Sequence, residues 1–137
     1  MNRMQIILVQ ISVWTLTLTG AVFAWMKYGM TSDDPFAVAN HPLQPSMLVI
    51  HLLAAPFAVF AFGWLFADHV LPKLSNGNPK RKRISGLSAL WIIPAMVMTG
   101  YALQVAVADW LRLGASAAHW ITSAVFLVAY VVHFRKM

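Results

Sequence analysis

Cysteine is absent from the 137 residues, and charge is scarce. Without cysteine the chain has no disulfide bonds, no iron–sulfur cluster, no thiol catalysis and no prosthetic group attached through a Cys-x-x-Cys-His motif. Charged residues make up 10% of the chain and apolar residues 60%, whereas soluble domains carry about 25% charged residues. A soluble domain of this composition would have too little polar surface to cover itself.

The charges also stand far apart along the chain. Uncharged runs of 23, 33, 25 and 22 residues separate Arg3 from Lys27, Asp34 from Asp68, Arg83 from Asp109 and Arg112 from Arg135. A membrane-spanning helix needs about 20 mostly apolar residues. The four runs therefore predict four transmembrane helices. The first run is longer than the apolar region of a signal peptide, so we expect it to be retained.

Prolines and turn signals mark the predicted loops. Pro35, Pro42 and Pro45 lie in the segment 27–45, and Ser75-Asn76-Gly77-Asn78-Pro79 is a turn signal within residues 72–83. We expect helices over residues 4–26, 46–71, 84–108 and 115–134, with a turn at 109–114. The predicted fold is all-α, a four-helix transmembrane bundle in a single domain over residues 1–137, without an internal repeat.

Basic residues are distributed unequally between the two ends of the predicted helices. Eight of them fall at the end that holds both termini: Arg3, Lys73, Lys80, Arg81, Lys82, Arg83, Arg135 and Lys136. Only Lys27 and Arg112 fall at the other end. Because Lys and Arg accumulate on the cytoplasmic side, both termini are predicted to be cytoplasmic. This topology accounts for the positive charge, so we expect no nucleic-acid partner.

Four of the five histidines stand in pairs on two of the predicted helices. His51 and His69 are 18 residues apart on the second helix, and His119 and His133 are 14 apart on the fourth. At about 100° per residue each pair keeps to one stripe of its helix. The second and fourth helices run in the same direction, so His51 and His119 share the outer level and His69 and His133 the inner level.

Two histidine pairs at two levels are the axial ligand pattern of two stacked b haems. We expect an outer haem on His51 and His119 and an inner haem on His69 and His133. Small residues such as Gly20 and Gly100 would leave room for the flat macrocycle. The separations, roughly 27 and 21 Å, differ, so tilt at Pro56, His41 as a replacement ligand and a single haem remain alternatives.

The arrangement resembles that of small four-helix membrane b-type cytochromes, which are subunits of respiratory oxidoreductases. The motifs that carry the resemblance are His41-Pro42-Leu43-Gln44-Pro45 followed by His51, Ser85-Gly86-Leu87, and Thr99-Gly100-Tyr101. The resemblance implies a multi-pass protein of the bacterial inner membrane. It also implies electron transfer between the quinone pool and a periplasmic cytochrome or a dehydrogenase subunit.

The remaining polar residues fit an electron-transfer subunit rather than a stand-alone enzyme. No acidic residue lies within the predicted spans, and no glycine-rich phosphate loop is present. His41, Gln44, Tyr101, Gln104 and Asp109 could bind a quinone at the outer side, or could simply be interfacial residues. Arg83 and Arg135 could pair with haem propionates or with lipid head groups. The alternative functions are proton or transition-metal transport and a cofactor-free membrane anchor.

Overall fold

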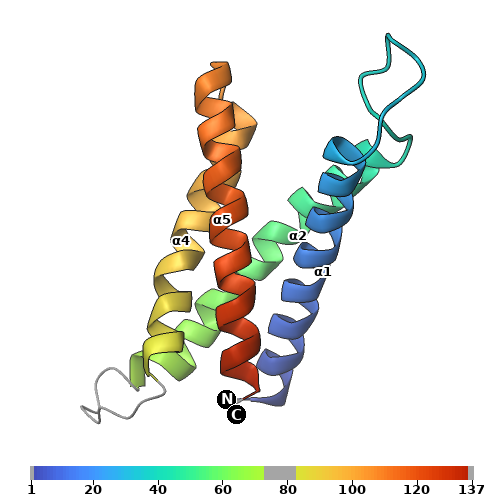
Figure 1. Cartoon of the computed structure of the whole chain (residues 1–137). Helices are drawn as coiled ribbons and strands as arrows, with labels where there is room; N and C mark the ends of the chain where they lie inside the picture. The colour runs from blue at the N-terminus through green and yellow to red at the C-terminus, as the bar shows by residue number, and fades with distance from the viewer. Residues whose placement is uncertain (1, 73–82, 136–137) are drawn as a thin grey trace. The chain divides into compact units, whose positions relative to one another are not determined.

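The computed structural model describes residues 2–72 and 83–135, which form helices and no strand. The chain divides into two compact units, Met1–Gly77 and Asn78–Met137. Within its described residues, each unit is a pair of contacting helices (Figure 1). The predicted all-α class with four main helices is confirmed. The turn signal at 75–79 and the basic residues at 80–82 lie outside the described residues.

Helix α1, Arg3–Tyr28, begins with a capping box. The Asn2 side chain accepts a hydrogen bond from the Met4 amide at 3.2 Å, and Gln5 Oε1 accepts one from the Asn2 amide at 2.9 Å. These bonds satisfy amides that a helix start leaves without intrahelical partners. At the other end the Gly29 amide donates to the Trp25 carbonyl at 2.8 Å. Both ends are thus set by local hydrogen bonds.

Helix α2, Gln44–Leu65, runs directly into a π-helical segment, η1, Phe66–Val70. Proline lies in the first turn of α2, where its missing amide is no loss, and Pro56 lies inside the helix. The π segment has wider turns than an α-helix. The predicted second helix was read as continuous α-helix, so the π segment is a difference that the hydropathy pattern did not indicate.

The first unit packs through small and medium side chains. Val9, Val13 and Ala24 of α1 are buried, as are Ala58 and Ala61 of α2. A polar contact joins the two ends of the unit: Gln5, only 1% exposed, donates from Nε2 to the Asp68 carboxylate of η1 at 2.5 Å. The segment Gly29–Leu43 joins α1 to α2 and projects beyond the helices (Figure 1).

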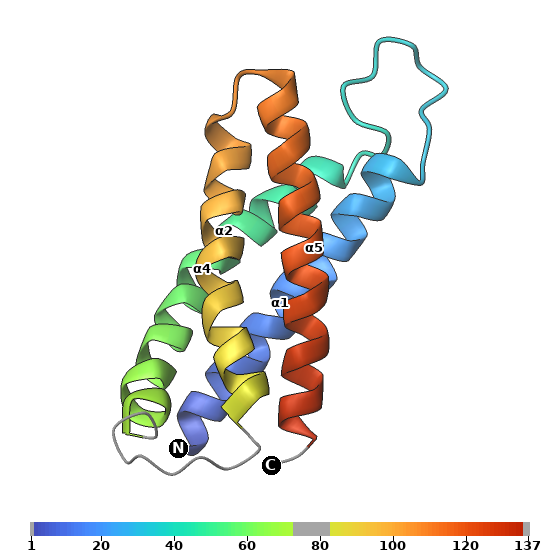
Figure 2. The same cartoon turned by 60° about the vertical axis from the view of Figure 1, so that its left-hand side comes forward.

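The second unit consists of α4, Arg83–Val105, and α5, Asp109–Phe134, which lie antiparallel (Figures 1 and 2). Only Ala106, Val107 and Ala108 separate them. The predicted turn at 109–114 was wrong in extent, because Gly114 lies inside α5. A glycine costs a helix only about 1 kcal/mol, and Asp109 in the first turn is favoured by the helix dipole.

The outward faces of the helices are apolar. Trp25, Phe57 and Trp91 are 60%, 73% and 77% exposed. Three helices are long and apolar enough to cross a membrane, namely Arg3–Tyr28, Gln44–Val70 and Asp109–Phe134. The apolar part of α4 within the described residues, Leu90–Val105, is shorter. The transmembrane helical character is confirmed, while the fourth crossing, the orientation and the joining of the units into one bundle stay predictions.

Candidate functional site

In the first unit, His51 of α2 faces a Thr-Gly pair on α1. His51 Nδ1 lies 3.1 Å from Thr19 Oγ1. A Cβ added to Gly20 would lie 3.0 Å from His51 Cε1 and 3.3 Å from Nδ1. The imidazole edge therefore packs directly against the α1 backbone, at a distance that only glycine allows without movement of a neighbour.

In the second unit, His119 of α5 faces a Thr-Gly pair on α4 in the same way. His119 Nδ1 lies 3.1 Å from Thr99 Oγ1 and 3.2 Å from the Met96 carbonyl oxygen. A Cβ added to Gly100 would lie 3.4 Å from His119 Cε1. The same three residue types thus meet through the same ring edge in both hairpins.

The two clusters are a structural repeat of this chain. Each unit has a threonine and the following glycine on its first helix, and a histidine on its second helix. Sequence reasoning missed this repeat, and it assigned the first and third helices only a wall-forming role. The signal was available, because the dipeptide Thr-Gly occurs in the sequence only at 19–20 and 99–100.

The two histidines predicted for the inner level have different surroundings. His69 lies in η1, next to Asp68, which accepts the hydrogen bond from Gln5. His133 lies in the last turn of α5. Both side chains are partly buried. Because η1 is a π segment, His69 does not keep the stripe and height that a continuous α-helix would give it relative to His51.

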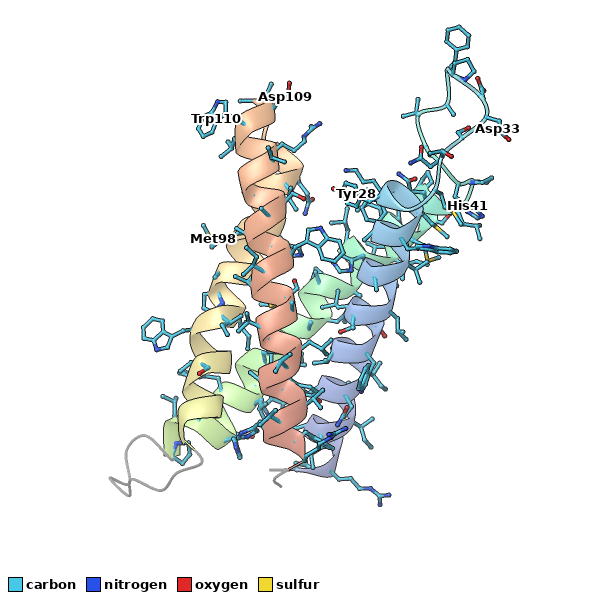
Figure 3. All side chains as sticks on the ribbon, viewed as in Figure 1. Tyr28, Asp33, His41, Met98, Asp109 and Trp110 are labelled. Atoms are coloured by element: carbon cyan, nitrogen blue, oxygen red, sulfur yellow. The ribbon has the colours of Figure 1, made fainter. Side chains whose placement is uncertain are left out.

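His41 and Gln44 take part in the hydrogen bonds that shape the loop into α2 (Figure 3). His41 Nδ1 accepts from the Leu43 amide at 3.1 Å, and its carbonyl accepts from the Gln44 amide at 3.0 Å. Gln44 Oε1 accepts from the Asn40 amide at 3.1 Å. The atoms expected to meet a quinone therefore also hold the local backbone, and the quinone site stays a prediction.

The other predicted outer residues belong to the second unit. Tyr101 is 58% exposed on α4, and Gln104 is exposed one turn further along the same helix. Asp109 and Trp110 open α5 (Figure 3). Arg135 at the end of α5 is exposed, and the side chain of Arg83 lies outside the described part of the chain. Their predicted roles are untested.

Across residues 2–72 and 83–135, no group of three or more His, Cys, Asp or Glu residues stands close enough to hold a metal ion. A haem iron with two imidazole ligands needs no such group. Comparison with protein-family models, curated proteins and solved structures finds no match to this chain. The candidate site is therefore argued from its own residues.

Proposed function

We propose that the chain is an electron-transfer membrane subunit that binds haem b, with His51 and His119 as the axial ligands of one haem. The observation that carries the proposal is the matched pair of clusters, in which each hairpin contributes one histidine faced by a Thr-Gly pair. Histidine within an apolar membrane helix is rare and is usually kept for a function. Two independent occurrences with the same neighbours favour a shared role.

The residues present fit a non-covalently bound haem. Its iron takes two imidazole nitrogens, and each hairpin supplies one. The chain has no cysteine, so covalent attachment through thioether bonds is excluded. When bound, haem supplies reversible one-electron chemistry. The remaining work falls to the protein, which holds two imidazoles in fixed orientations within apolar helices and keeps water away from them.

The wider function follows from the sequence pattern and belongs to the proposal. A second haem on His69 and His133 would extend electron transfer across the bilayer. The partners would be membrane lipid, quinone, and a periplasmic cytochrome or dehydrogenase subunit, in the bacterial inner membrane. The short connections between helices leave no room for a soluble catalytic domain, which supports a subunit rather than a complete enzyme.

The test is a haemin titration of the full chain in lipid nanodiscs, followed by pyridine haemochrome analysis. We expect His51→Ala and His119→Ala each to lose the same haem. The matched control is His41→Ala, which removes a histidine from the connecting loop instead of a helix. Because His41 bonds only to the loop backbone in the described contacts, this variant should keep the wild-type haem content.

Two results would contradict the proposal. Wild-type protein that shows no reducible b-type spectrum after titration would remove haem from the function and leave transport or anchoring. Loss of haem in His41→Ala, with haem retained in His51→Ala, would transfer the ligand role to His41.

A further inference from the structure

The two threonine hydroxyls that face the histidine rings have only one proton each to donate. Thr19 Oγ1 lies 2.7 Å from the Thr15 carbonyl oxygen and 3.4 Å from that of Leu16. A carbonyl oxygen cannot donate, so the short contact to Thr15 requires the hydroxyl proton. Thr19 Oγ1 is then left to accept a hydrogen bond from His51 Nδ1, which must carry a proton.

The same accounting holds in the second hairpin. Thr99 Oγ1 lies 2.8 Å from the Ala95 carbonyl oxygen and 3.0 Å from that of Met96. His119 Nδ1 lies 3.2 Å from the Met96 carbonyl as well as 3.1 Å from Thr99 Oγ1. The Met96 carbonyl can only accept, so Nδ1 of His119 must also be the donor.

We infer that Thr19 and Thr99 are positioning residues, which hold His51 and His119 in the tautomer protonated at Nδ1 and so present Nε2 as the metal-binding nitrogen. In a neutral imidazole one nitrogen carries the proton and the other carries the lone pair. The other ring N–H of a metal-bound histidine usually donates to an oxygen acceptor, which fixes the ring and raises its basicity. Gly20 and Gly100 complete the arrangement by letting each ring edge approach the neighbouring helix.

The tautomer assignment stands on the hydrogen bonds alone, whereas its effect on haem rests on the proposed function. Two readouts separate them. The first is ¹⁵N and ¹H NMR of ring-labelled histidines in the full chain, prepared without haem in lipid nanodiscs at alkaline pH. The second is the affinity of the same preparation for haemin.

We expect His51 and His119 of the wild-type chain to be protonated at Nδ1. In Thr19→Val the Nδ1–H resonance of His51 should move upfield because its bond to the hydroxyl is lost. Haem affinity should fall about 10- to 100-fold, as it does when other second-shell partners of metal ligands are removed. Thr19→Ser keeps the hydroxyl and should restore both values. Thr99→Val should move the His119 resonance in the same direction.

Thr122→Val is the matched control. Thr122 on α5 makes the same kind of bonds back along its helix, to the carbonyls of Ala118 at 2.8 Å and His119 at 3.1 Å, and none to a histidine ring. It should change neither readout. A wild-type His51 protonated at Nε2, or an unchanged His51 resonance in Thr19→Val, would overturn the inference. A correct tautomer in a chain that binds no haem would overturn only the proposed function.

Discussion

A buried imidazole in an apolar hairpin is costly unless its polar nitrogens have partners, and Thr19 and Thr99 supply them. The spacing of His51 and His119 along the sequence predicted them as site residues. It could not predict the threonine partners, because these come from a neighbouring helix whose register is not contained in the periodicity of either helix. The repeated Thr-Gly dipeptide was the one signal that pointed to them.

Gly20 and Gly100 differ in how much space their histidines leave, and this difference gives a prediction. Alanine at position 20 would place a Cβ 3.0 Å from His51 Cε1, whereas at position 100 the distance to His119 Cε1 is an ordinary 3.4 Å. Overpacking costs about 1–3 kcal/mol, and the higher helix propensity of alanine offsets about 0.5–1 kcal/mol. Gly20→Ala should therefore lower the free energy of unfolding by about 1–2 kcal/mol.

Thermal unfolding of the full chain in detergent micelles measures this effect, with Gly100→Ala as the matched control. The control should be neutral or slightly stabilising, because alanine fits there without displacing the ring. Equal melting temperatures for the two variants would show that the close contact at Gly20 carries no strain.

At the scale of elements, the uncharged runs predicted the four main helices because apolar length alone decides which segments can cross a membrane. Two details were not predictable in this way. The π segment Phe66–Val70 is as apolar as the α-helix that it continues, and hydropathy does not distinguish the two. The start of α5 at Asp109 was obscured by Gly114, which is usual in turns but is tolerated inside this helix.

The contact between Gln5 and Asp68 ties the start of α1 to η1, and its removal is a second prediction. Hydrogen bonds to charged groups contribute about 1.5–3 kcal/mol. Gln5→Leu should lower the free energy of unfolding by about 2 kcal/mol and speed amide hydrogen exchange in the first turn of α1 and in η1.

Gln10→Leu is its control, since Gln10 bonds only to the Trp14 indole four residues along the same helix. That change should stay within about 0.5 kcal/mol and should leave exchange in η1 unaltered. Comparable losses of stability in the two variants would argue against a role for the Gln5–Asp68 contact in holding the hairpin together.

At the scale of the whole molecule, the sequence predicted the transmembrane helical character but not the organisation into two equivalent hairpins. The repeat became visible only through contacts, since the two halves share few residues beyond the Thr-Gly pair and the histidine. Equivalent hairpins suit a site in which each half offers the same ligand.

Orientation in the membrane gives a further prediction at this scale. Eight basic residues at the end with both termini, against two at the other, predict a cytoplasmic C-terminus. A reporter that functions only outside the cytoplasm, fused after Met137, should be silent, while the same reporter inserted after Asp34 in the α1–α2 loop should be active. The opposite pattern would reverse the assignment of outer and inner levels.

The central claim, that His51 and His119 ligate one haem, is tested most directly in the variant His69→Ala/His133→Ala, which leaves only the outer pair. Near-infrared magnetic circular dichroism of the oxidised protein identifies both axial ligands of a haem. The account predicts one b haem per chain with two imidazole ligands. A variant that binds no haem, or a haem with a single imidazole and a different second ligand, would contradict it.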